Sequence, residues 1–147
     1  MLPIQVLLVE DNPADARLTR EALADSKLRM DVREARDGEA AIEALRGVGG
    51  TTGERLPDLI LLDLNLPRMD GREVLAEIKS HAEWKSIPVV VLTSSKAEKD
   101  ILKSYQLHAN CYITKPIDLT QMQEIVQNMK DFWFTVVRLP QENSDAR

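Results

Sequence analysis

Three carboxylates stand where short apolar runs of the sequence end. Asp63 follows residues 59–62, and Glu10 and Asp11 follow residues 4–9. Short runs of Leu, Ile and Val bounded by turn residues are typical of strands buried on both faces of a parallel sheet. In an open α/β sheet, ligands bind at the carboxyl ends of the strands. If these two strands are neighbours, the three carboxylates meet at one edge of the sheet.

Such a cluster calls for a positive partner, because carboxylates held close together repel one another. Mg²⁺ is a hard cation that prefers oxygen ligands and is typically held by a few carboxylates together with phosphate oxygens. The spacing of Glu10, Asp11 and Asp63 along the chain therefore predicts a Mg²⁺ site.

Two further apolar runs end in polar side chains. Thr93 follows residues 88–92, and Lys115 follows residues 111–114. Taken singly, an acidic pair is typical of a helix start, a Thr of a turn and a Lys of a solvated surface, so that only Asp63 stands out. Taken together, the side chains provide carboxylates for a metal ion, a nucleophilic carboxylate, a hydroxyl donor and a cation. These are the groups that phosphoryl transfer requires.

The elements that would position these groups alternate regularly along the chain. Strands are predicted over residues 4–9, 29–35, 59–63, 88–92 and 111–114, and helices over 14–24, 39–46, 72–81, 97–107 and from 118 onward. Right-handed crossovers between parallel strands place helices on both faces of a sheet. The expected fold is therefore α/β, with a five-stranded parallel sheet, doubly wound in the flavodoxin-like manner.

The first predicted helix has clear start signals. Asn12 is suited to cap it and is followed by Pro13 at the first helical position. Leu18, Ala22 and Leu23 are expected on its inner face.

A Gly-rich segment at residues 47–54 has some resemblance to a phosphate-binding loop. It lacks the terminal Gly-Lys-Ser/Thr and follows no strand, so that a mobile surface connection is the preferred interpretation.

Composition narrows the class of protein. A chain of 147 residues with 44% hydrophobic and 29% charged residues suits one globular domain. A net charge of −5 argues against nucleic-acid binding, which usually needs a basic surface. The single cysteine fits a reducing compartment. No signal peptide is visible, and no apolar stretch approaches the roughly 20 residues of a membrane helix. A cytoplasmic protein that does not enter a membrane is expected.

The combined motifs resemble the receiver domain of bacterial two-component response regulators, including stand-alone chemotaxis-type regulators. The resemblance covers residues 4 to about 131. It rests on the segments Leu7-Leu8-Val9-Glu10-Asp11, Leu61-Leu62-Asp63-Leu64-Asn65-Leu66-Pro67, Met69-Asp70-Gly71, Thr93-Ser94 and Tyr112-Ile113-Thr114-Lys115-Pro116. Each piece alone is weakly specific, but the combination is highly specific.

The resemblance implies a role for each matching residue of the site. Asp63 would accept a phosphoryl group from a phosphohistidine of a sensor histidine kinase. Asp11, Asp63 and the backbone carbonyl of Asn65 would ligate Mg²⁺ directly, and Glu10 would act mostly through a bound water. Lys115 would pair with a phosphoryl oxygen.

The same resemblance implies a conformational output. Thr93 would hydrogen-bond the phosphoryl group, and the space that it leaves would admit the ring of Tyr112, whose alternative role is that of a half-buried strand aromatic. The peptide bond before Pro116 is expected to be cis, as in the family, which would aim the preceding Lys115 inward. Phosphorylation would then shift a two-state equilibrium rather than create a new fold.

The chain also exceeds a minimal receiver at its C-terminus. Residues 1–131 would form the receiver domain and residues 132–147 an extension with a disordered end. The extension resembles that of small regulators paired with phytochrome-type photoreceptor kinases. Its aromatics either complete the last helix against the core or belong to an arm that docks on a second subunit in a homodimer. The arm is favoured, and its expected interface residues are Phe132, Trp133, Phe134, Val136, Val137 and Leu139.

Two other functions compete with that of a phosphoacceptor switch, which is not an enzyme in the ordinary sense. A Mg²⁺-dependent phosphohydrolase of the haloacid dehalogenase type also uses a strand-end Asp, a Thr or Ser and a Lys. It needs a second Asp two residues after the nucleophile, where this chain has Asn65. A receiver that works only as a phosphorylation-independent interaction module would not need the complete set of polar residues.

Overall fold

The computed structural model describes residues 3–24, 29–47, 56–94, 98, 109, 111–115, 118 and 120–121. Strands and helices alternate along the chain as the sequence predicts. Their order is β1 (Ile4–Val9), α1 (Pro13–Ala24), β2 (Met30–Ala35), α2 (Gly38–Arg46), β3 (Leu59–Asp63), α3 (Gly71–Ser80), β4 (Val89–Thr93) and β5 (Cys111–Thr114).

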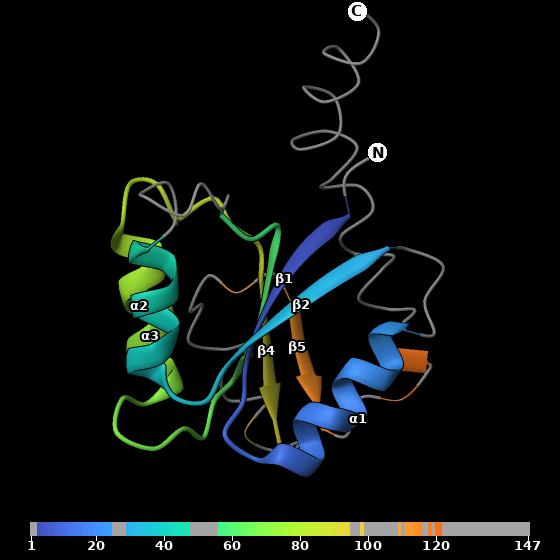
Figure 1. Cartoon of the computed structure of the whole chain (residues 1–147). Helices are drawn as coiled ribbons and strands as arrows, with labels where there is room; N and C mark the ends of the chain where they lie inside the picture. The colour runs from blue at the N-terminus through green and yellow to red at the C-terminus, as the bar shows by residue number, and fades with distance from the viewer. Residues whose placement is uncertain are drawn as a thin grey trace, which may run out of the picture.

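The five strands form one parallel sheet in the order β2-β1-β3-β4-β5. Helix α1 covers one face, and α2 and α3 cover the other (Figure 1). The predicted doubly wound α/β fold is therefore confirmed. Because the strands are parallel, β1, β3, β4 and β5 present their carboxyl ends along the same edge of the sheet.

The core lies in two layers, one on each face of the sheet. Every residue of β3 and β4 is buried, as the continuous apolar runs predict. Successive residues of a strand point to opposite faces. Leu62, Val91 and Tyr112 therefore join the layer under α2 and α3, whereas Leu61 and Leu92 join the layer under α1. Packing on both faces fixes the positions of the strand ends.

Helix α1 begins as predicted, and Ala22 and Leu23 pack toward the core as expected, but Leu18 does not. The side chain of Asn12 accepts hydrogen bonds from the backbone N–H groups of residues 14 and 15, at 2.9 and 3.0 Å. Ala16, Thr19 and Leu23 are buried, whereas Leu18 is 46% exposed. The prediction for Leu18 is wrong. Leu18 and Leu23 are five residues apart, and at about 100° per residue they lie on different sides of the helix, about 140° apart around its axis.

Other predicted boundaries shift slightly. Strand β4 is Val89–Thr93 rather than 88–92, so that Thr93 is the last residue of the strand instead of the first residue after it. Asp37 caps α2, and its side chain accepts a hydrogen bond from the backbone N–H of Ala40 at 2.7 Å. Within the described residues, no helix is both long and apolar enough to cross a membrane.

Several predictions fall on parts of the chain outside the described residues. These are residues 48–54 of the Gly-rich segment, all of the helix at 97–107 except Glu98, most of the helix after Asp118, Pro116 with its cis peptide bond, and the whole extension at 132–147 with its expected interface residues.

Candidate functional site

The acidic residues that follow β1 meet Asp63 at the end of β3 because these strands are neighbours, with Val9 opposite Leu62 in the sheet. Glu10, Asp11 and Asp63 each provide one carboxylate oxygen, and these three oxygens all lie within 4.8 Å of one another. Two oxygens on one octahedral Mg²⁺ lie at most about 4.2 Å apart, twice the usual Mg–O distance. Small side-chain adjustments would bring these three oxygens onto one ion, and the donor set fits a hard divalent cation.

The three carboxylates differ in their exposure to solvent. Glu10 and Asp63 are each only 2% exposed, whereas Asp11 is exposed. Burial, followed by the hydrogen bond and the negative charge of Asp63, raises the pKa of Glu10 to about 7, although Lys115 acts in the opposite direction. Near neutral pH, the cluster therefore retains a proton that a bound cation would displace.

Lys115 brings the fifth strand into the site. Its Nζ donates hydrogen bonds to Glu10 Oε1 at 3.0 Å, to Asp15 Oδ2 at 3.0 Å and to Asp63 Oδ2 at 3.2 Å. Burial by itself lowers the pKa of Lys115, but the hydrogen bonds to Asp15 and Glu10 and the charges of Asp63 and Glu10 outweigh burial and raise that pKa above its usual value. Lys115 is therefore a fixed positive charge at the centre of the site.

Thr93 and Tyr112 lie on the two adjacent strands β4 and β5. Thr93 is fully buried, and its hydroxyl donates a hydrogen bond to Glu98 Oε1 at 2.9 Å. Tyr112 is 8% exposed and packs in the core layer under α2 and α3. This Thr93 hydrogen bond is directed to a carboxylate from the segment that follows β4, rather than to Asp63.

The loop after Asp63 is held close to it by short contacts. The backbone N–H of Asn65 donates to Asp63 Oδ1 at 3.1 Å, and that of Gly71 donates to the Leu64 carbonyl at 3.1 Å. A β-carbon at Gly71 would lie 2.6 Å from the Asp63 carbonyl oxygen, so that only glycine fits without a shift. Arg68 has a φ of 65°, in the left-handed region that side-chain-bearing residues rarely adopt. The contacts of Asn65 and Gly71 thus hold this loop close to the end of β3.

Two residues of this network were not singled out as site residues in the sequence. Asp15 lies in the first turn of α1, two residues after Pro13, and its place next to the strand end that carries Glu10 and Asp11 offered a signal. Glu98 lies five residues after Thr93, in a segment without strong periodicity, and nothing in the pattern distinguishes it from its charged neighbours.

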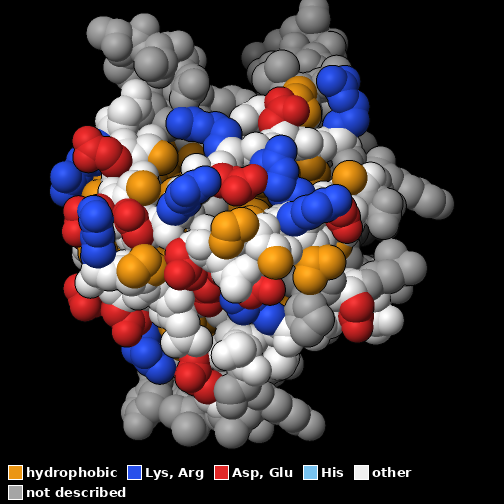
Figure 2. All heavy atoms as spheres, turned by 60° about the horizontal axis from the view of Figure 1, so that its bottom comes forward, with side chains coloured by type: hydrophobic (Ala, Val, Ile, Leu, Met, Phe, Trp, Pro, Cys, Tyr) orange, Lys and Arg blue, Asp and Glu red, His pale blue; other side chains and the backbone are white. Residues whose placement is uncertain are grey.

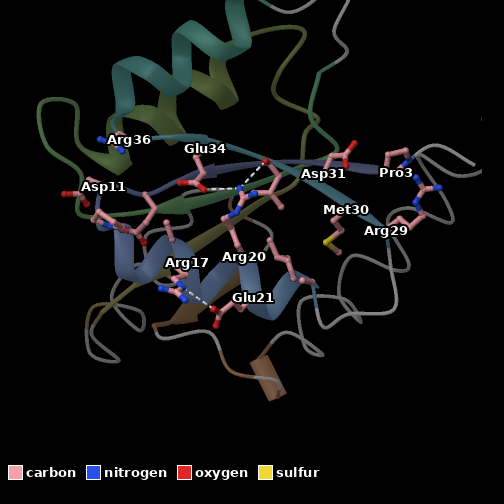
Figure 3. Close-up of a pocket in the computed structure, with 16 residues that line it drawn as sticks. Pro3, Asp11, Arg17, Arg20, Glu21, Arg29, Met30, Asp31, Glu34 and Arg36 are labelled. Carbon is pink, nitrogen blue, oxygen red and sulfur yellow. Dashed lines mark hydrogen bonds and ion pairs between the residues drawn. The ribbon is translucent and has the colours of Figure 1, made fainter.

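A groove on the described surface lies beside the acidic cluster, between α1 and β2 (Figure 3). Asp11 stands at one end of it, and its charged side chains include the ion pairs Arg17–Glu21 at 3.3 Å and Arg20–Glu34 at 2.9 Å. Figure 2, with the carboxyl ends of the strands turned forward, shows acidic and basic side chains interspersed. Among the described residues, the side chains on this face form no continuous basic patch of the kind that binds nucleic acid.

The fold and the site define the class of protein. Residues 6–127 match the response regulator receiver domain, and the chain belongs to this family. It is a receiver-type response regulator and not a conventional enzyme, so that the phosphohydrolase alternative is excluded by family membership.

Particular relatives include regulators that bear the name of phytochrome. The chain is 49% identical to response regulator Rcp1 of Synechocystis over 138 residues, 94% of each chain. Among solved structures, it is 53% identical to the phosphorylated cyanobacterial phytochrome response regulator RcpA, with a TM-score of 0.72 over 91% of this chain and 96% of that one. It is 40% identical to the bacteriophytochrome response regulator AtBRR, with a TM-score of 0.79 over 90% of this chain and 96% of that one. The predicted likeness to phytochrome-associated regulators is thereby confirmed.

Proposed function

We propose that Asp63 is the phosphoacceptor of this receiver and that it takes the phosphoryl group from a phosphohistidine of a sensor kinase. The observation that supports this role is the convergence of Asp63, Glu10, Asp11 and Lys115 at one edge of the sheet. A carboxylate oxygen of Asp63 attacks phosphorus in line, its bond to phosphorus forms as the phosphorus–nitrogen bond breaks, and the histidine is released as imidazole.

The other residues of the site stabilise the charge that moves with the phosphoryl group. Glu10, Asp11, Asp63 and the backbone carbonyl of Asn65 would hold Mg²⁺, which neutralises oxygens of the phosphoryl group when it is bound. A structure of the relative Rcp1 is described as Mn²⁺-bound. Lys115, already 3.2 Å from Asp63, supplies the second positive charge.

The output of the site is a change of partner for Thr93. Its hydroxyl leaves Glu98 and donates to a phosphoryl oxygen, which offers more charge and more acceptor sites than the free carboxylate of Asp63. Tyr112 packs in the adjacent strand and is the side chain placed to respond. Contact with a further protein or onward phosphotransfer then carries the signal.

Phosphorylation by a small donor tests the proposal. Incubation with acetyl phosphate and Mg²⁺ is expected to give one acid-labile phosphoryl group per chain, and the yield should collapse when Mg²⁺ is chelated. Absence of acid-labile phosphate in the well-folded protein would instead favour a phosphorylation-independent interaction module.

Phosphotransfer profiling against a panel of histidine kinases identifies the partner. Two relatives are described as phytochrome response regulators, so that a phytochrome-type photoreceptor kinase is the expected donor. A kinase makes phosphohistidine from ATP, which is abundant in the cytoplasm, and we propose that this regulator acts there. Faster transfer from unrelated kinases than from phytochrome-type kinases would contradict the partner assignment.

Magnesium affinity is expected to depend on pH through Glu10. The pKa of this side chain is raised to about 7, whereas its ordinary value is 4.5, and Mg²⁺ must displace the retained proton. Affinity should fall by up to about tenfold per pH unit below pH 7 and level off above it. Calorimetric titration over this range measures the effect. Glu10→Gln should remove most of the pH dependence. A Mg²⁺ affinity that does not change with pH in the unmodified protein would refute the role of the Glu10 proton.

The extension at residues 132–147 is proposed to mediate a homodimer, while residues 1–131 form the receiver domain. The alignment with Rcp1 spans 138 of the 147 residues and therefore includes part of the extension. A chain truncated after Lys130 is expected to sediment as a monomer at concentrations where the full chain is dimeric. Unchanged self-association after truncation would argue against this role.

A further inference from the structure

Lys115 has one acceptor that the metal site does not need. An ammonium group carries three N–H donors, and all three are used here, by Glu10, Asp15 and Asp63. Glu10 and Asp63 belong to the trio of carboxylates that can hold a cation, together with Asp11. Asp15 does not belong to that trio.

Asp15 also differs from the other two acceptors in its surroundings. Its side chain is 33% exposed, whereas those of Glu10 and Asp63 are 0% and 2% exposed. Its backbone N–H is held by the side chain of Asn12 at 3.0 Å, within the capped first turn of α1. The start of the helix therefore fixes the position of Asp15, so that it does not depend on Lys115 for its place.

A cation on Glu10 and Asp63 weakens two of the three contacts of Lys115, because the ion and the ammonium draw on the same two carboxylates and repel each other. The contact with Asp15 at 3.0 Å is then the one that remains. We propose that Asp15 is a positioning residue that retains Lys115 when a divalent cation occupies Glu10 and Asp63, and that competes with the phosphoryl group for the same ammonium. This inference rests on the proposed roles of Asp63 and Lys115.

The two consequences of losing the Asp15 charge have opposite signs. Without it, Lys115 is held only by Glu10 and Asp63 and competes more strongly with the cation, so that Mg²⁺ binds more weakly. Once the cation is bound, Lys115 is free to pair with a phosphoryl group and one nearby negative charge is gone, so that the phosphoryl group is held more strongly. Damage to the fold would weaken both interactions.

Asp15→Asn tests this inference, because asparagine keeps the size of the side chain and removes its charge. We expect the Kd for Mg²⁺ to rise by about threefold or more, and the affinity for beryllium fluoride at saturating Mg²⁺ to increase by about threefold or more. Both are measured by calorimetry, with beryllium fluoride as the stable analogue of the phosphoryl group. Loss of both affinities, or no change in either, overturns the inference.

Glu21→Gln is the matched control. Glu21 lies on the same helix, pairs with Arg17 along the groove in Figure 3, and loses the same charge when substituted. Both affinities are expected to stay within about twofold of the unmodified protein, since the ion pair is exposed and distant charges are screened. Changes as large as those of Asp15→Asn would show a general charge effect and would contradict a specific role for Asp15.

A double substitution tests whether Asp15 acts through Lys115. In a Lys115→Met background, Asp15→Asn should change the Mg²⁺ affinity by less than about twofold. An equal loss in both backgrounds would show that Asp15 acts only as a nearby charge. If the proposed function is wrong, the unmodified protein itself binds neither Mg²⁺ nor beryllium fluoride. That result differs from every result that would overturn only the role of Asp15.

Discussion

Asp63→Asn is expected to reduce phosphorylation by acetyl phosphate, or by a phosphorylated kinase, to background while the fold stays intact. The amide lacks the anionic oxygen that attacks phosphorus. Asp63 is buried at the end of β3, next to Glu10. Removing its charge relieves repulsion, so that the free energy of unfolding should change by no more than about 1 kcal/mol.

Asp31→Asn provides the comparison for this substitution. Asp31 lies on the edge strand β2, is exposed, and accepts a hydrogen bond from the Gln5 side chain at 3.2 Å. The Asp31→Asn protein should accumulate acid-labile phosphate at the rate of the unmodified protein. Phosphorylation of the Asp63→Asn protein at an ordinary rate would remove Asp63 from its proposed role, provided that circular dichroism and thermal unfolding show both variants folded.

Gly71→Ala is expected to have the largest effect on stability. Gly71 is the first residue of α3, where helix propensity alone would favour alanine by about 1 kcal/mol. The added β-carbon would meet the Asp63 carbonyl oxygen at 2.6 Å and two backbone atoms of Leu64 at 2.7 Å. Backbone atoms cannot rotate away, so that the strand end must shift. We expect a loss of about 2–3 kcal/mol in the free energy of unfolding, together with slower phosphorylation because Asp63 moves.

Gly47→Ala is the corresponding control. Gly47 follows α2 with φ −73°, and a β-carbon there would meet its nearest neighbour, the Glu43 carbonyl oxygen, at 3.5 Å, an ordinary contact. Urea unfolding should show this variant to be as stable as the unmodified protein or more stable by a few tenths of a kcal/mol. Equal stability of Gly71→Ala and the unmodified protein would mean that the loop after Asp63 is not confined as described.

The positions of the strand ends were predictable from the sequence. Continuous apolar runs identify buried parallel strands, and a parallel sheet places their carboxyl ends together whatever the exact strand order. Glu10, Asp11, Asp63, Thr93 and Lys115 were therefore found as a group from their places after these runs. The family resemblance added a role for each of them, and those roles remain predictions.

Contacts between side chains of separate elements were not predictable in the same way. That Lys115 reaches Asp15 on α1, and that Thr93 donates to Glu98, depends on distances that no periodicity encodes. Leu18 illustrates the opposite error, because a large apolar residue was assigned to the core by its type while the turn of the helix places it outside. Hydrophobic type is a weaker guide than position on the helix when the apolar face is narrow.

Borohydride reduction of the phosphorylated protein tests the central claim most directly. An acyl phosphate is reduced to an alcohol, so that the phosphorylated aspartate becomes homoserine, and peptide mass spectrometry then locates it. Homoserine at position 63 alone, formed only when acetyl phosphate and Mg²⁺ are both present, is the expected result. Homoserine at another aspartate, or phosphate retained on a serine, threonine or histidine with Asp63 unchanged, would contradict the assignment of Asp63 as the acceptor.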